Sequence, residues 1–326
     1  MFRDPFSFTG RRRSGFFEGW YCKNVAPDGT AYSFIPGISH SKRGDEHAFV
    51  QVIRGSDGET EYVRYPLDQF SASTRHFNVQ VGENRFSFDG ASIVLPDAFD
   101  GIEGSLTFSG VRRLRSSSGI KHIMGWYRLV PFMECYHEVG SLSHTVSGSL
   151  QIGDRQLLFD GGRGYLEKDW GTSMPSAWIW LECNGFPAAE ASIMLSVARI
   201  PWLGKSFTGF LGFLALPHSI AAEPVRFGTF SGARITKIDI EANALLVEID
   251  INGRTVAIRA ERNATGLLSA PVAGGMDRRI AESVDGTVTV TVRRNDGTTE
   301  WESTGGAAGV ELVGVIDSLK PDGGRR

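Results

Sequence analysis

The feature that most constrains this chain is the regular recurrence of aspartate or asparagine followed by glycine. Such pairs stand at residues 28–29, 57–58, 89–90, 252–253, 285–286 and 295–297. This dipeptide accepts the positive φ angles that a tight hairpin turn requires. The spacing therefore predicts a chain built from β-hairpins.

The segments between these turns predict strands. Residues 77–81, 245–251 and 287–292 alternate in polarity or are rich in β-branched and aromatic residues, and the last reads Thr-Val-Thr-Val-Thr-Val. A period of two places one face of a strand in the core and the other in water. Only residues 188–200 carry a weak helical period; we expect a strand there too, because its neighbours are strands and Pro201 follows.

Many short strands with almost no helix between them favour an all-β fold of antiparallel barrels or sandwiches over alternating α/β units. With 326 residues, the chain is long enough for two lipocalin-like (calycin-type) barrels side by side. We expect an N-terminal domain over residues 1–172 and a C-terminal domain over residues 173–326. A barrel of about eight strands can enclose an apolar ligand.

The charge balance argues against nucleic acid as a partner, because the formal net charge is −3 and the sequence pI is about 6.2. Arg11, Arg12 and Arg13 form the one basic cluster, which we interpret as a solvated tail or a contact to phosphates at a membrane surface. The first fifteen residues lack the apolar region of a secretory signal. We therefore expect a cytoplasmic protein, with peripheral membrane contact left open.

Cysteine and glycine patterns predict neither a metal centre nor a cofactor site. Cys22, Cys135 and Cys183 form no CxxC pair, and we interpret them as reduced core thiols. Residues 161–164 (GGRG) lack the lysine of a phosphate-binding loop. We expect chemistry that needs no cofactor.

The first acidic segment of interest is residues 16–23, FFEGWYCK. On a strand, Glu18, Trp20 and Cys22 would share one face. A carboxyl beside an indole suits a site for an apolar ligand. The alternative, which residue types leave equally open, is an edge strand whose Glu18 pairs with a cation.

The second segment is residues 125–138, GWYRLVPFMECYHE. If it is extended, Glu134 and Tyr136 share one face, whereas Cys135 and His137 take the other. Apolar surroundings would raise the pKa of Glu134, and a neutral carboxyl can donate a proton. A buried glutamate satisfied by backbone groups or by Arg128 is the structural alternative, and a metal site of His137 with Glu134 has weak spacing support.

The third segment, GYLEKDWG at residues 164–171, is the most distinctive. On a strand, Glu167 and Asp169 point the same way as Tyr165, whereas Lys168 and Trp170 face oppositely. Two carboxylates at this spacing can shift each other's pKa and divide acid and base roles. A structural turn held by a lysine–glutamate pair is the alternative.

Two of these segments resemble signature blocks of the tocopherol cyclase family: residues 17–21 (FEGWY) and 165–171 (YLEKDWG), with Pro175, Trp178, Trp180 and Asn184 after the second. The second block is also similar, more faintly, to the acidic-tryptophan block of carotenoid hydratases, whose members have paired lipocalin-like barrels. Position 169 is aspartate, where plant-like cyclases commonly have asparagine. The division of roles between Glu167 and Asp169 therefore stays open.

The resemblance implies acid-catalysed ring closure. A proton adds to a prenyl double bond, and a phenolic oxygen captures the tertiary cation to form a chromanol. Indole faces can stabilise such a cation by roughly 0.5–2 kcal/mol each. The predicted catalytic residues are Glu167 and Asp169, with Glu18 and Glu134 as alternates. The predicted substrate-binding residues are Trp20, Tyr21, Trp126, Tyr136, Tyr165, Trp170, Trp178, Trp180 and Asn184.

Two other functions stay open. The barrel could hold a lipid or isoprenoid without changing any bond, or the site could admit water and hydrate an apolar polyene. In each case the expected partner is an apolar small molecule. Family resemblance does not specify the ligand.

Overall fold

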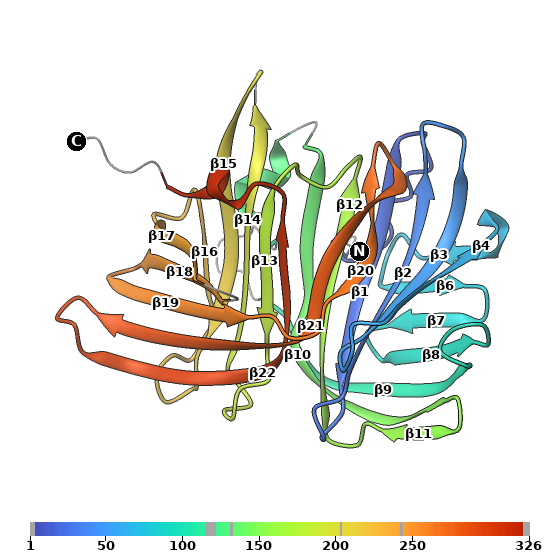
Figure 1. Cartoon of the computed structure of the whole chain (residues 1–326), viewed down its shortest axis with the longest axis horizontal. Coiled ribbons are helices and arrows are strands. Elements are labelled where there is room, and N and C mark those ends of the chain that lie inside the picture. Colours follow the sequence, from blue (N-terminus) through green and yellow to red (C-terminus); the bar gives the residue numbers. More distant parts are fainter. Residues whose placement is uncertain (1–3, 115–121, 131–132, 203, 242–243, 322–326) are drawn as a thin grey trace. The chain divides into compact units, whose positions relative to one another are not determined.

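The structure is a computed structural model that describes residues 4–114, 122–130, 133–202, 204–241 and 244–321, without the side chains of Trp126 and Leu129. These residues contain no α-helix and only three short 3-10 helices, η1 (Leu67–Gln69), η2 (Gly125–Leu129) and η3 (Ile316–Leu319). All other regular structure is antiparallel β-sheet (Figure 1). The all-β prediction is confirmed.

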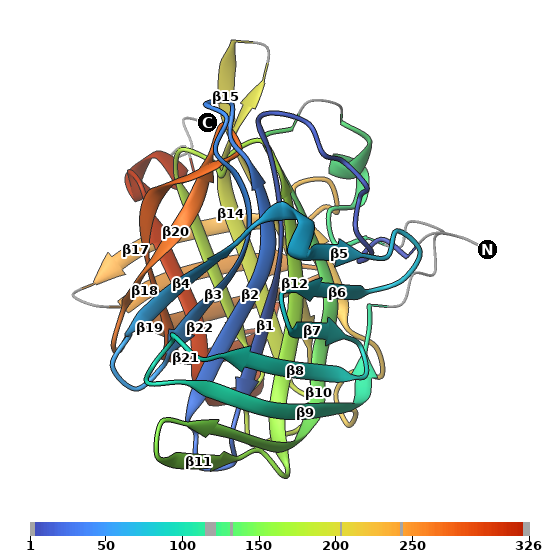
Figure 2. The ribbon, with the colours of Figure 1, turned by 90° about the vertical axis from the view of Figure 1, so that its right-hand side faces the viewer.

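Twelve of the described strands form one sheet. They are β1 (Phe16–Val25), β2 (Ala31–His40), β3 (Glu46–Arg54), β4 (Thr60–Tyr65), β5 (Phe70–Ala72), β6 (Asn78–Val81), β7 (Asn84–Ser87), β8 (Gly90–Leu95), β9 (Ile102–Arg112), β10 (Cys135–Ile152), β11 (Arg155–Leu158) and β12 (Gly162–Gly171). The order along the sheet is β4-β3-β2-β1-β12-β10-β9-β8-β7-β6-β5, and β11 pairs with β10. The sheet is strongly curled (Figure 2), and Asn84 Nδ2 of β7 donates to Tyr65 Oη at the end of β4 at 3.2 Å.

The other ten described strands form the second sheet. They are β13 (Trp178–Cys183), β14 (Ser192–Trp202), β15 (Lys205–Ala215), β16 (Val225–Gly228), β17 (Arg234–Glu241), β18 (Ala244–Ile251), β19 (Arg254–Glu261), β20 (Gly266–Val272), β21 (Gly275–Arg294) and β22 (Thr299–Val313). Their order is β16-β15-β14-β13-β22-β21-β19-β18-β17, and β20 pairs with β21. The expected strand at residues 188–200 is confirmed as part of β14.

The chain divides into two compact units. The first contains residues 1–174 and 266–280, and the second contains residues 175–265 and 281–326. The hairpin at residues 266–280 belongs to the first unit because it docks on β3: Ser269 N donates to Gln51 Oε1 at 2.7 Å. Domains that fold independently over residues 1–172 and 173–326 stay a prediction.

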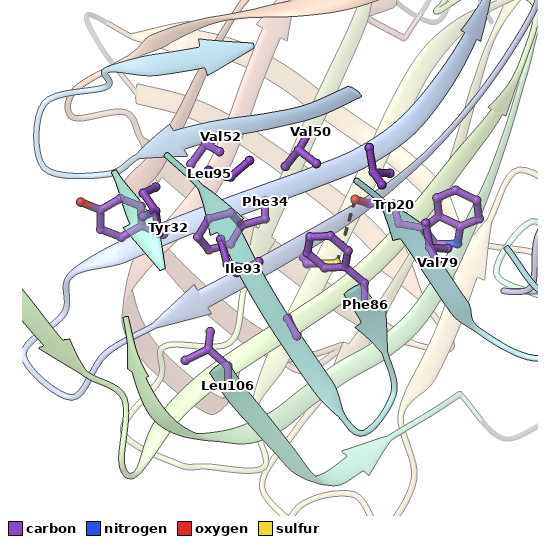
Figure 3. Close-up of a cluster of buried hydrophobic side chains, with 14 of the residues drawn as sticks. Trp20, Tyr32, Phe34, Val50, Val52, Val79, Phe86, Ile93, Leu95 and Leu106 are labelled. Carbon is purple, nitrogen blue, oxygen red and sulfur yellow. Dashed lines mark hydrogen bonds between the residues drawn. The ribbon is translucent and has the colours of Figure 1, made fainter. Parts of the chain in front are cut away.

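Each unit has its own apolar core, as period-two strands require. In the first, side chains from β1, β2 and β3 face those from β6 to β9; Trp20, Phe34, Val50, Phe86 and Leu106 are among them (Figure 3). In the second, Ile179, Leu181 and Leu195 are among the residues that pack against β18, β19 and β21.

Five of the six predicted turns lie between paired strands. At residues 252–253, for example, Asn252 and Gly253 have φ angles of 49° and 78° and connect β18 to β19. The prediction at residues 285–286 is wrong, because Asp285 and Gly286 lie inside β21 at a shift in strand register. There, a side chain at Gly286 would meet the Glu261 carbonyl at 2.6 Å, so close backbone approach accounts for the glycine.

Candidate functional site

Strand β12 lies between β1 and β10 near the middle of the first sheet. Its register places Asp169 beside His137 of β10 and Glu167 beside Tyr21 of β1. Tyr165, Glu167 and Asp169 share one face, whereas Leu166 belongs to the core on the other. The predicted division of side chains along this strand is confirmed, and the alternative of a structural turn is wrong because the segment is a strand.

His137, Glu167 and Asp169 form a compact cluster on this face. His137 Nδ1 lies 3.0 Å from Asp169 Oδ1, and His137 Nε2 lies 3.6 Å from Glu167 Oε2. Tyr165 Oη donates a hydrogen bond of 2.7 Å to Glu167 Oε2. The cluster is shielded from solvent: the side chains of His137, Glu167 and Asp169 are 11%, 6% and 22% exposed.

The electrostatics of the cluster favour a charged imidazole. Burial lowers the pKa of His137, but the nearby carboxylates of Glu167 and Asp169 outweigh it and raise the pKa to about 9. His137 therefore carries its proton at neutral pH. Cys135 Sγ lies 3.7 Å from Asp169 Oδ1, and burial together with this carboxylate raises the thiol pKa, which keeps Cys135 protonated. Cys135 is thus a neighbour of the cluster, not a core thiol.

Lys168 and Glu18 form a second ionic group on the opposite face of the sheet. Lys168 Nζ lies 2.7 Å from Glu18 Oε1, and neither side chain is exposed. Lys168 also donates to the Ser7 carbonyl at 2.6 Å, and Glu18 accepts from the Thr9 amide at 2.9 Å. Glu18 is therefore paired to a cation, as one sequence interpretation held, although β1 is an internal strand and not an edge.

Several predicted ligand contacts lie on this second face, away from the cluster. Trp20 is fully buried and donates to the Phe6 carbonyl at 2.9 Å, so it belongs to the packed core. Trp170 stacks on Tyr136 at 5.6 Å and lies 4.5 Å from Lys168 Nζ. Trp170 and Tyr136 line a cavity of about 310 Å³. The structure does not bring these three rings together with Glu167 and Asp169.

Residues of the N-terminal segment form half of the lining of this cavity. Phe6 and Phe8 are buried in that core, and Pro5, Ser7, Thr9 and Arg11 line the cavity with His122 and Arg128. His122 in turn is hydrogen-bonded to the buried Glu138. The chain's own N-terminal segment thus occupies part of the barrel interior.

The other predicted residues are dispersed. The Glu134 carboxyl is half-buried, which raises its pKa, and its backbone carbonyl accepts from Thr172 N at 2.7 Å. Tyr21 is buried on the cluster face, opposite Glu167. The side chain of Trp126 lies outside the described residues.

Trp178, Trp180 and Asn184 belong to the second unit and are buried. Trp178 and Trp180 alternate along β13 with Ile179 and Leu181, which belong to the core, so the indoles take the other face. Trp178 Nε1 donates to the Glu311 carboxylate. As substrate contacts, these residues stay a prediction.

His137 is the residue that sequence reasoning undervalued. The alternation of side-chain direction along a strand correctly placed His137 on the face opposite to Glu134 and Tyr136. However, only the pairing of β10 with β12 places His137 opposite Asp169. His137, Glu167 and Asp169 each offer one ligand atom, and these atoms lie within 4.8 Å of one another. The cluster therefore has the size and donors to hold a cation as well as a proton.

The part of the sequence that contains this cluster is similar to a known protein family. Residues 106–204 match the family model described as tocopherol cyclase-like. A chloroplastic tocopherol cyclase of Zea mays is 31% identical over 74 residues, and a relative from Oryza sativa subsp. japonica is 28% identical over 78 residues. These alignments span 23% and 24% of this chain but only 16% and 17% of the relatives.

Comparison with solved structures concerns the fold. CghA in complex with Sch210972 superposes with a TM-score of 0.56 at 12% identity, covering 92% of this chain and 88% of CghA. An AttH protein of Nitrosomonas europaea gives a TM-score of 0.53 at 13% identity, covering 90% and 92%. Among the described residues, no helix has the length and apolar character that crossing a membrane demands.

The matched stretch contains His137, Tyr165, Glu167 and Asp169, whereas the first resembling block at residues 17–21 lies outside it. The resemblance to the tocopherol cyclase family, expected from residues 165–171, is thus confirmed over residues 106–204.

Proposed function

We propose that this chain is an acid catalyst related to tocopherol cyclases. It would close a chromanol-type ring in a prenylated hydroquinone or a related isoprenoid without a cofactor. The observation that carries the proposal is the shielded cluster in which Glu167 and Asp169 hold His137 protonated. The family match over the same residues supports it.

The charges of the cluster suit protonation of an alkene. With His137 protonated, two carboxylates and one imidazolium leave a net charge of −1. Once the proton has moved to the substrate, the net charge is −2 beside a new tertiary carbocation. A raised pKa makes His137 a weak acid. However, the attraction between the two carboxylates and the developing carbocation stabilises the transition state in a shielded site.

The reaction conserves atoms and needs no redox partner. The proton forms a C–H bond at the less substituted alkene carbon and leaves a tertiary cation. The phenolic oxygen then forms the C–O bond, and its proton returns to the cluster. We assign the return to Glu167, whose orientation is held by the Tyr165 hydroxyl. The proton then passes from Glu167 to His137, whose Nε2 lies 3.6 Å from Glu167 Oε2, and this transfer restores the imidazolium for the next turnover. The product is an isomer of the substrate.

The experiment is turnover of a prenylated hydroquinone in D2O, followed by mass spectrometry. Cyclisation by this route adds one carbon-bound deuterium per product, at the former alkene carbon. Glu167→Gln and His137→Gln should each lower turnover by two or more orders of magnitude, roughly the size of a general acid–base contribution. Substrate affinity and the circular dichroism spectrum should remain close to those of the wild type.

The matched control is Glu103→Gln, which removes an exposed carboxylate from β9 of the same sheet. It should retain full turnover. Products heavier than the substrate by one water would indicate a hydratase, and binding without turnover of either a hydroquinone or a polyene would indicate a carrier. Wild-type rates in both cluster variants would refute the assignment of the acid.

A further inference from the structure

The β14–β15 hairpin extends beyond the strands on either side of it. Strand β13 pairs with β14 as far as Ala198, and β16 pairs with β15 as far as Leu211. Among the described residues, the three rows from Ile200–Phe207 to Trp202–Lys205 therefore pair only with each other, whereas Arg199 N in the row before them still donates to the Ala177 carbonyl at 2.9 Å. We call residues 199–202 and 205–208 the tongue. It is the yellow pair of strands that rises past β13 in Figure 1.

The tongue exposes several apolar side chains to solvent. Trp202 is 49% exposed, Pro201 is exposed, and Ile200 and Phe207 are only partly buried. An isolated two-stranded hairpin is marginally stable in water. Exposed apolar side chains gathered on such a projection are typical of an interaction site.

Two further exposed apolar residues lie at the same end of the second sheet. The loop that holds Phe230, 63% exposed, is fixed beside β15 by a hydrogen bond from Thr229 N to the Phe210 carbonyl. Val315, 70% exposed, precedes η3, where the Ser318 carbonyl accepts from Arg199 and Thr208 of the tongue. Three separate segments thus present apolar side chains at one end.

The β14–β15 hairpin carries charge of one sign. Residues 191–222 contain no aspartate or glutamate, although the whole chain has 37 acidic residues. The tongue itself contributes two cations, Arg199 and Lys205. The nearest acid on η3, Asp317, is paired with Lys320 at 2.8 Å.

We propose that the tongue docks this protein on an anionic lipid surface. Tryptophan favours the interface between headgroups and acyl chains, and flanking lysine and arginine are attracted to anionic lipids. Three rows of about 3.3 Å give a projection of roughly 10 Å, enough to reach the depth of about 5–10 Å at which interfacial segments bury apolar side chains. This inference goes beyond the proposed reaction and does not depend on it.

The test is cosedimentation of the whole chain with phosphatidylcholine vesicles, with and without about one third phosphatidylglycerol. We expect binding to the anionic vesicles, a loss of at least tenfold in partition coefficient for Trp202→Ser, and loss of the preference for anionic vesicles for Lys205→Glu. The control is Leu158→Ser, which removes a side chain that is 58% exposed on β11 of the first unit. It should bind as the wild type does.

Three outcomes would overturn the proposal. The wild type could fail to bind either kind of vesicle, or Trp202→Ser could bind as tightly as the wild type. The third is a wild-type dimer in sedimentation equilibrium that Trp202→Ser dissociates, which would assign the tongue to a second copy of this chain. Circular dichroism of each variant establishes that it is folded.

Discussion

Replacing Lys168 by methionine should destabilise the protein strongly. The substitution removes a buried ammonium group that lies 2.7 Å from Glu18 and leaves that carboxylate without its cation. Breaking a buried ion pair from one side typically costs about 3–5 kcal/mol, most of which is the penalty of an uncompensated buried charge. Because neither side chain is exposed, we expect a loss within that range.

The converse variant, Glu18→Leu, should cost at least as much. It leaves Lys168 charged in the core and also removes the acceptor of the Thr9 amide, which lies 2.9 Å from Glu18 Oε1. An unsatisfied buried amide adds about 1–3 kcal/mol. The double variant should be more stable than the sum of the two losses predicts, since it contains no unpaired charge.

Equilibrium unfolding in urea, followed by circular dichroism and tryptophan fluorescence, measures all three losses. Trp20 and Trp170 lie 5.3 and 4.5 Å from Lys168 Nζ, so the emission reports on this region. Losses below about 1 kcal/mol for both single variants, or strictly additive losses, would refute the reasoning. If Glu18→Gln stopped turnover and left the stability unchanged, Glu18 would be a catalytic acid and not a structural one.

The remaining predictions concern the cluster around His137. Turnover should fall as the pH rises through about 9, because the pKa of His137 is raised to about 9 and its proton is lost above that value; a rate that keeps rising to pH 10 would contradict this. The stabilisation that His137 contributes, measured against His137→Gln in urea, should be largest below the ordinary histidine pKa of about 6.5 and vanish above pH 9. EDTA should leave turnover unchanged; a loss that Zn²⁺ or Mn²⁺ restores would instead assign His137, Glu167 and Asp169 to a metal.

The local sequence pattern was sufficient to predict to which face of a single strand each side chain points. Alternation along residues 164–171 placed Glu167 and Asp169 with Tyr165 and separated them from Lys168, because side chains of a strand point to opposite sides in turn. Turn chemistry likewise marked five hairpins. It failed at Gly286, where the glycine serves a close approach to the Glu261 carbonyl inside β21.

Pairing between distant strands could not be predicted in this way. Nothing local to residues 135–138 shows that β10 lies beside β12, so His137 had no visible connection to Asp169, 32 residues further along the chain. Trp20 and Trp170 were predicted to bind the same substrate as Glu167 and Asp169, although alternation along residues 164–171 already turned Trp170 to the other face. In the structure Trp20 belongs to the core and Trp170 lines the cavity of the second face, so neither lies beside the two carboxylates.

The sequence by itself determined an all-β chain, the side to which each residue of β12 points, and the resemblance to tocopherol cyclases. Those properties depend on neighbours a few residues apart. Only the tertiary structure decided that His137 joins Glu167 and Asp169 and that Lys168 neutralises Glu18. Both outcomes depend on register across a sheet, and a shift of one residue would have turned each of these side chains to the opposite face.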